Sequence, residues 1–203
     1  MPITATSYRC SDQYIQMPRP IYRGIYIKLN CPIIKRYCSN NTMEIQPTLI
    51  NAARIGDITF LRSVLDDGVN VNFSDEKGYT PLIIACYNRQ IEAAKLLIES
   101  GADVNAADIG GNTALMGVCF KGYPEIADLL IDNGADLNMQ HGNGGTALMF
   151  ATMFGRNDLV QIMLNKGANP EITEFRGLTA LDLAIQQGNY QAAQLLEEFA
   201  QRN

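Results

Sequence analysis

The feature that most constrains the fold is a pattern of residues that recurs every 33 positions. Threonine recurs at this step as Thr80, Thr113, Thr146 and Thr179. Three further columns keep the same step: Gly78, Gly111, Gly144 and Gly177; Gly68, Gly101, Gly134 and Gly167; and Leu82, Leu115, Leu148 and Leu181, with Leu49 one period earlier. Composition alone does not place glycine and threonine at fixed offsets. The pattern therefore indicates a repeat protein, in which each unit packs on its neighbours.

One period predicts two short helices followed by a hairpin loop. Thr80 is suited to cap a helix, and Pro81 is suited to its first position, where the missing N–H costs nothing. The first predicted helix spans residues 81–88, and it must be packed because so short a helix is unstable alone in water. The second spans about residues 91–100, where apolar residues recur at steps of three and four. Gly101 suits the left-handed conformation that ends a helix.

These residues resemble the ankyrin repeat, a family with a 33-residue period and a Thr-Pro-Leu-His-x-Ala signature. Residues 80–85 are Thr-Pro-Leu-Ile-Ile-Ala, and residues 113–115, 146–148 and 179–181 are Thr-Ala-Leu. A second signature, Gly-Ala-Asp-Val-Asn, occupies residues 101–105 and recurs with leucine at 134–138. The resemblance covers residues 44–203. It implies an all-α solenoid of about five helix-turn-helix repeats with hairpin loops, at about residues 43–75, 76–108, 109–141, 142–174 and 175–203.

Two positions depart from the family pattern. The signature histidine is absent, and its column holds Ile50, Ile83, Met116, Met149 and Asp182. We expect apolar packing to replace most of the hydrogen bonds that this histidine makes between repeats. Arg89 stands where the other repeats have Gly56, Gly122, Gly155 and Gly188. If that turn needs a positive φ, either Arg89 adopts it under strain or Asn88 takes it instead.

Charge divides the chain at about the point where the repeats begin. Residues 1–42 carry six basic residues and one acidic residue, whereas residues 43–203 carry ten basic and twenty acidic residues. An acidic domain repels phosphate backbones, so we expect no nucleic-acid partner for the repeats. Within the non-repeat segment 1–42, residues 21–29 alternate as a strand does. The segment is either a basic arm that contacts an acidic partner or membrane surface, or a poorly ordered tail that lies upstream of a native start at Met43.

The sequence offers no set of residues suited to catalysis, metal binding or cofactor binding. The one histidine, His141, falls in a hairpin column with Asp75, Asp108 and Glu174, and it leaves no Ser-His-Asp triad and no two-histidine metal site. The five cysteines match no zinc spacing, and Cys86 and Cys119 lie in apolar helical stretches. Residues 142–145 are rich in glycine but lack the lysine and hydroxyl residue of a phosphate-binding loop. We therefore predict that the chain is not an enzyme.

The resemblance implies that a partner docks on the concave face, at the hairpin tips and the exposed edge of the first helices. Two columns fall on that edge: Arg54, Tyr87, Phe120, Met153 and Gln186, and Ile55, Asn88, Lys121, Phe154 and Gln187. We predict as partner-binding residues Tyr79, Tyr87, Ile109, Asn112, Phe120, Lys121, Met153, Phe154, Phe175 and Arg176. Aromatic residues and methionine on an exposed face are typical of an interface core. The alternative is that these side chains fold back to cover neighbouring helices.

The sequence thus predicts a non-enzymatic, monomeric module that binds an unidentified partner protein. We expect that partner to have an apolar centre and, because the repeat domain is acidic, a basic rim. A regulatory or inhibitory subunit that covers the active site of a partner enzyme remains the alternative function. No apolar run reaches the roughly 18 residues of a membrane span, and no clear secretion signal is present. With a cysteine usage typical of reducing compartments, these features favour the cytoplasm.

Overall fold

The computed structural model of the chain describes residues 15–16, 26–27 and 42–202. The chain divides into two units, residues 1–42 and 43–203. In the first unit, strand β1 (Ile15–Gln16) pairs antiparallel with strand β2 (Tyr26–Ile27), with Ile15 opposite Ile27. Strand β2 falls within the strand predicted at residues 21–29. The rest of that strand and most of the segment predicted to be poorly ordered lie outside the described residues, and the native start at Met43 stays a prediction.

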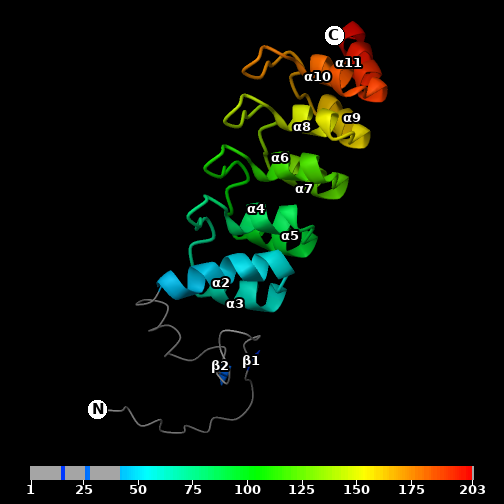
Figure 1. Cartoon of the computed structure of the whole chain (residues 1–203). Coiled ribbons are helices and arrows are strands. Elements are labelled where there is room, and N and C mark those ends of the chain that lie inside the picture. The colour runs from blue at the N-terminus through cyan, green and yellow to red at the C-terminus, as the bar shows by residue number, and fades with distance from the viewer. Residues whose placement is uncertain (1–14, 17–25, 28–41, 203) are drawn as a thin grey trace, which may run out of the picture. The chain divides into compact units, whose positions relative to one another are not determined.

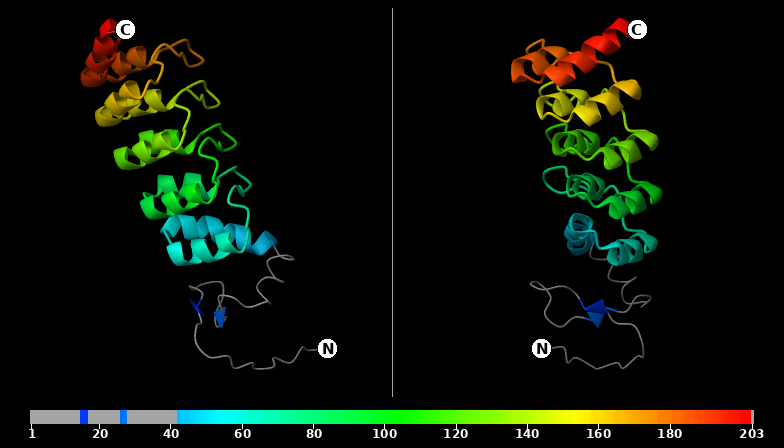
Figure 2. Two further views of the ribbon diagram at one scale, coloured as in Figure 1. Left: turned by 180° about the vertical axis from the view of Figure 1, so that it is seen from behind. Right: turned by 90° about the vertical axis from the view of Figure 1, so that its right-hand side faces the viewer.

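Ten helices lie within residues 42–202, and they form five successive pairs (Figure 1). The pairs are α2 (Thr42–Ile55) with α3 (Ile58–Asp66), α4 (Pro81–Tyr87) with α5 (Ile91–Glu99), α6 (Ala114–Lys121) with α7 (Pro124–Asp132), α8 (Ala147–Met153) with α9 (Asn157–Asn165), and α10 (Ala180–Gln187) with α11 (Tyr190–Arg202). They stack in sequence order, and Figure 2 shows that the hairpin loops joining them project to one side of the stack. The predicted all-α solenoid of about five repeats is confirmed.

The recurring threonine caps the first helix of repeats two to five. Thr80 Oγ1 accepts the N–H of Ile83 at 3.2 Å. The hydroxyl oxygens of Thr113, Thr146 and Thr179 likewise accept the N–H of the residue three positions later. The cap supplies an acceptor for an N–H that has no partner inside the helix. In the last repeat the Asp182 carboxylate also accepts the backbone N–H of Thr179, and the two hydrogen bonds form a capping box.

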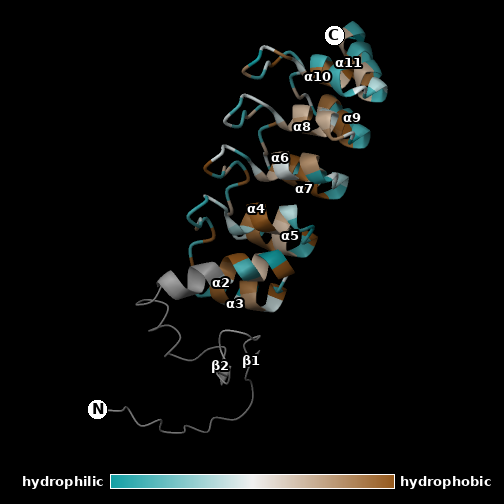
Figure 3. Ribbon diagram, in the orientation of Figure 1, coloured by the Kyte–Doolittle hydropathy of each residue, from teal (hydrophilic) through white to brown (hydrophobic). Residues whose placement is uncertain are grey.

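The hydrophobic core lies between successive helix pairs. The recurring leucine is buried at Leu49, Leu82, Leu115 and Leu148, and the column of the missing histidine is buried at Ile50, Ile83, Met116 and Met149. Burial of each such side chain contributes about 1.5–3 kcal/mol, so apolar packing stabilises the stack at every junction. Figure 3 shows the consequence in the ribbon: the hydrophobic segments are concentrated in the helices, while the hairpin loops are mainly hydrophilic.

Backbone hydrogen bonds join each hairpin tip to the next. Ile109 N–H donates to the Lys77 carbonyl at 3.0 Å, Gly142 N–H to the Gly110 carbonyl at 2.7 Å, and Phe175 N–H to the Asn143 carbonyl at 3.0 Å. Because the three bonds connect equivalent positions in successive repeats, they fix the spacing of the hairpins along the stack.

Asparagine side chains make a second set of bonds between repeats. Asn105, in the loop after α5, donates its amide to the Gly134 carbonyl at 3.0 Å and accepts the N–H of Asp136 at 2.8 Å. Asn72 makes the equivalent two bonds to Gly101 and Asp103. The asparagine that ends the Gly-Ala-Asp-Val-Asn signature therefore ties its own loop to the loop of the next repeat.

Replacing Gly78 by alanine is expected to destabilise the stack more than the same change at Gly101. Both glycines have a positive φ, +81° and +88°, so each substitution costs about 1–2 kcal/mol of left-handed strain. A Cβ on Gly78 would also lie 2.7 Å from the backbone nitrogen of Ile109, whereas nothing lies within 4 Å of one on Gly101. We expect Gly78→Ala to lose a further ~1–3 kcal/mol in urea unfolding followed by circular dichroism. Equal losses would contradict the contact between hairpins.

Candidate functional site

Four aromatic rings meet along the first helices of the three central repeats, and we call them the aromatic cluster: Tyr87, Phe120, Phe154 and Phe150. Tyr87 and Phe120 are stacked, with centroids 6.3 Å apart and an interplanar angle of 6°. Phe120 meets Phe154 edge to face at 4.5 Å, and Phe154 stacks on Phe150 at 6.5 Å. Such pairs contribute about 0.5–1.5 kcal/mol each beyond their buried area. The cluster is therefore a continuous surface across three repeats.

The repeat period positions the cluster. Tyr87 ends α4 and Phe120 lies one period later near the end of α6, so stacking of the repeats brings the two rings together. Met153 holds the same column at the end of α8, but the ring that contacts Phe120 belongs to Phe154, the residue that caps α8. Phe150 was not among the predicted site residues. Its signal in the sequence is its spacing of four from Phe154, which places both side chains on one helix face.

The members of the cluster differ in exposure. Tyr87 and Phe154 are 41% and 42% exposed, and the neighbouring Met153 is 38% exposed. Phe120 and Phe150 are half-buried. The Nζ atom of Lys121 lies 4.3 Å from the centroid of the Tyr87 ring, which is a cation–π contact between two repeats. Of the predicted residues, the structure thus brings Tyr87, Phe120, Lys121, Met153 and Phe154 together.

The predicted residues of the hairpins have more varied surroundings. Ile109 and Phe175 are 78% and 80% exposed at two tips. Arg176 is exposed and pairs with Glu174, Nε to Oε1, at 3.2 Å. Tyr79 packs against the hydrophobic core, and the Asn112 amide donates to both Asp108 carboxylate oxygens at 3.0 and 3.1 Å. Tyr79 and Asn112 therefore support their own hairpins.

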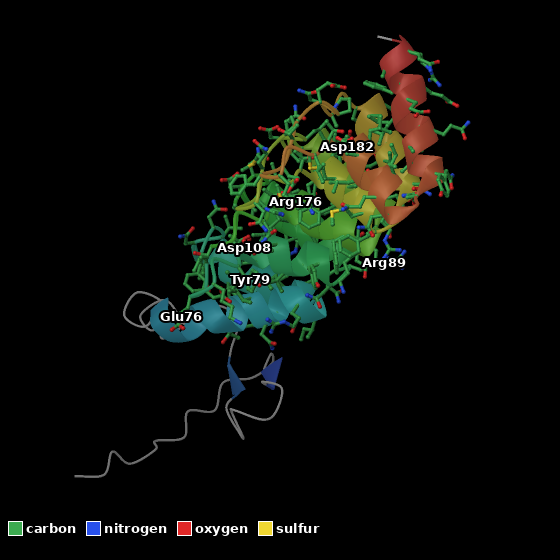
Figure 4. All side chains as sticks on the ribbon, turned by 45° about the horizontal axis from the view of Figure 1, so that its top comes forward. Glu76, Tyr79, Arg89, Asp108, Arg176 and Asp182 are labelled. Carbon is green, nitrogen blue, oxygen red and sulfur yellow. The ribbon has the colours of Figure 1, made fainter. Side chains whose placement is uncertain are left out.

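The turns between the two helices of a pair lie at the other end of the helices. In Figure 4 Tyr79, Asp108 and Arg176 lie on the hairpin side, and Arg89 lies at the opposite end. Among the described residues, Arg89 is the one non-glycine residue with a positive φ, +59°. Asn88 has a φ of −97°, so Arg89 itself takes the strained position.

Contacts with the next repeat hold Arg89 in place. Its guanidinium donates to Glu125 Oε1 at 2.8 and 2.9 Å and lies 5.2 Å from the centroid of the Tyr123 ring. Hydrogen bonds from its own backbone N–H and from Arg89 lower the pKa of Glu125. These contacts offset part of the strain and tie the second repeat to the third.

His141 serves the third hairpin as a structural residue. Its Nδ1 atom accepts the N–H of Asn143 at 2.7 Å, as the Asp75 carboxylate accepts the N–H of Lys77 at 2.9 Å in the first hairpin. The imidazole ring meets Phe150 edge to face, with centroids 5.1 Å apart. His141 therefore connects the aromatic cluster to a hairpin loop.

The described residues contain no group of three side chains suited to hold a metal ion. Cys86 and Cys119 are fully buried, and this burial raises the pKa of each thiol to about 12. Thiols in such surroundings are protonated at neutral pH and unsuited to nucleophilic attack.

Comparisons with known proteins agree with this geometry. A family model described as ankyrin repeats (3 copies) matches the chain over residues 28–108, 49–141 and 115–202. The first match begins at residue 28, whereas the period predicts that the first repeat begins at about residue 43. A search of curated proteins gave no significant match. Ankyrin repeats are generally protein–protein interaction modules and are typically non-catalytic. None of the helices that the structure describes is long and apolar enough to cross a membrane.

Cys86 and Cys119 are expected to resist alkylation in the folded protein. Their thiol pKa of about 12 leaves little thiolate at pH 8, and burial excludes the reagent. Iodoacetamide labelling followed by peptide mass spectrometry should show modification at least roughly a hundredfold slower than in urea, where the thiol pKa returns to about 8.5. Native labelling as fast as in urea would show a reactive thiol and reopen the question of cysteine chemistry.

Proposed function

The chain belongs to the ankyrin-repeat family, and on that premise we propose that it is a non-enzymatic module that binds a partner protein through its concave face. The aromatic cluster and Met153 form the centre of the docking surface. The observation that carries the proposal is the exposure of Tyr87, Met153 and Phe154 on the first helices, where Phe120 connects the Tyr87 ring to the Phe154 ring. Contiguous apolar side chains on a folded surface mark interaction sites, and aromatic residues dominate binding energy there.

The contrast with α5, the second helix of its pair, supports this choice of surface. Exposed positions of α5 are polar or charged, as at Glu92, Lys95 and Glu99. The ends of the first helices α4 and α8 instead expose Tyr87, Met153 and Phe154. Solubility alone favours polar residues at both places, so the apolar residues on the first helices need another explanation, which a bound partner provides.

The alternative that these side chains cover neighbouring helices applies to part of the cluster. Phe120 lies between Tyr87 and Phe154 and is itself half-buried. Its truncation would disturb both neighbours, so a loss of binding on truncating Phe120 would not separate packing from recognition. Tyr87 and Phe154 are better probes, because their exposed parts are free to contact a partner.

Truncation of both probes is expected to weaken binding without unfolding the protein. The full chain and its Tyr87→Ala, Phe154→Ala variant serve as baits in a native lysate, and captured proteins are identified by mass spectrometry. The affinity for a purified captured protein is then measured by biolayer interferometry. If the pair includes a hot spot, binding should weaken by about 2 kcal/mol, or roughly 30-fold.

A variant with one exposed aromatic removed elsewhere provides the control. Tyr190 is 80% exposed at the start of α11, and Tyr190→Ala is expected to leave the affinity unchanged. Equal affinities of all three proteins would exclude the aromatic cluster as the docking surface. A melting temperature that falls in step with affinity would favour the packing role.

The same reagents address the inhibitory-subunit alternative. If the captured partner is an enzyme, its activity is measured with and without a saturating amount of the chain. Inhibition by the wild type that is lost in the Tyr87→Ala, Phe154→Ala variant would establish the regulatory function. Full enzyme activity in the saturated complex would leave a simple binding module.

A further inference from the structure

Basic residues line the turn ends of the first helices, although the repeat domain as a whole is acidic. Residues 43–203 carry twenty acidic and ten basic residues. The equivalent segments 51–57, 84–90, 117–123 and 150–156 contain four of these basic residues, which we call the basic row: Arg54, Arg89, Lys121 and Arg156. Their one acidic residue, Asp57, caps α3 by accepting the N–H of Phe60 at 3.0 Å. The negative charge of the domain therefore lies mainly elsewhere.

Contacts between repeats place the basic row beside the aromatic cluster. Lys121 lies over the Tyr87 ring of the preceding repeat. Arg156 Nε donates to the backbone carbonyl of Phe120 at 3.4 Å, again one repeat earlier. Two cations of the row thus contact residues of the cluster directly.

Three members of the row have no partner of opposite charge among the residues that the structure describes. Elsewhere in the described part of the chain, ion pairs join Lys95 to Glu92, Lys166 to Asp132, Arg176 to Glu174 and Arg202 to Glu198. In the row, Arg89 pairs with Glu125. Arg54, Lys121 and Arg156 make no ion pair with any described carboxylate. The guanidinium of Arg54 donates to the Asn51 amide oxygen at 3.4 Å, and its backbone carbonyl accepts from the Gln90 amide at 3.3 Å. These three charges are available to a ligand.

Acidic residues next to the basic row already take part in ion pairs or hydrogen bonds within the domain. Glu92, Glu125 and Asp158 lie in the first turns of α5, α7 and α9. Glu92 and Glu125 are ion-paired as described, and Asp158 Oδ1 accepts the N–H of Leu159 at 2.9 Å. They offset the positive charge of the row only in part.

We propose that the partner segment that docks on the aromatic cluster is an acidic peptide segment with apolar or aromatic side chains between its carboxylates. Its apolar side chains cover Tyr87 and Phe154, and its carboxylates meet Arg54, Lys121 and Arg156. The proposal rests on the proposed function and reverses the expectation of a basic rim, which considered only the net charge of the domain. Charge-assisted hydrogen bonds and complementary potentials supply specificity and speed the encounter. A long polyanion such as nucleic acid fits less well, because it would extend over the acidic second helices.

Selection from a random peptide library on the immobilised full chain tests the proposal. We expect the enriched peptides to be acidic and to contain aromatic or large aliphatic residues. The affinity of a synthetic copy of the most enriched peptide is measured by fluorescence anisotropy. In the variant Arg54→Gln, Lys121→Gln, Arg156→Gln its binding should weaken by at least about tenfold, and wild-type binding should weaken as salt rises.

A second triple variant is the control, because it changes the net charge by the same amount as the first. Arg62→Gln, Lys95→Gln, Lys166→Gln removes three exposed positive charges from the second helices and the turns at their ends, and should change the affinity by less than about threefold. Circular dichroism verifies the fold of both variants. If the first variant does not fold, the exposed Arg54→Gln alone replaces it, with Arg62→Gln as its control.

The outcomes separate this proposal from the proposed function. Enrichment of basic or neutral peptides that the Tyr87→Ala, Phe154→Ala variant fails to bind would refute the acidic partner and leave the docking surface intact. Acidic peptides that bind both triple variants equally would also refute it. Failure to enrich any peptide, or tighter binding of a single-stranded oligonucleotide of the same charge, would count against the acidic peptide as well.

Discussion

The structure depends on packing between successive helix pairs, because no pair can bury its own apolar residues. One column shows this directly. Cys86, Cys119 and Thr152 are completely buried in the interior repeats, whereas Ile185, at the same position in the last repeat, is 58% exposed. The helices that carry these residues are alike, so the difference comes from the repeat that follows. Each repeat therefore buries part of the apolar surface of its neighbour, as expected for a solenoid.

The bonds that hold the repeats in register also organise the surface. Hairpin tips are joined by backbone hydrogen bonds and the loops by Asn72 and Asn105. Because the spacing is fixed, side chains that lie one period apart in sequence become neighbours in space. Tyr87 stacks on Phe120 for this reason, and Lys121 reaches the Tyr87 ring. An interaction surface thus arises from the same repetition that builds the core, without a dedicated binding loop.

Charge illustrates why net composition is a poor guide to recognition. The repeat domain is acidic as a whole, yet a partner meets a local surface whose potential depends on the nearest unpaired groups. Lys121 and Arg156 lie at that surface without a described ionic partner, whereas the negative charge of Glu125 is offset by its ion pair with Arg89. Since ankyrin architecture is shared by proteins with unrelated roles, such local chemistry distinguishes one member from another, and the fold alone does not.

The sequence by itself determined the period, the threonine caps, the family and helix limits close to those observed, at 81–87 and 91–99 against predictions of 81–88 and about 91–100. These features are local or strictly periodic, so a single chain displays them. Only the tertiary structure decided that Arg89 rather than Asn88 takes the positive φ, that Phe150 joins the aromatic cluster, and that Tyr79 turns toward the core. A residue's position in the period does not decide these features, because each depends on the side chains that folding brings beside it. For Arg89 these come from the next repeat, and for Phe150 the ring of Phe154 comes from its own repeat.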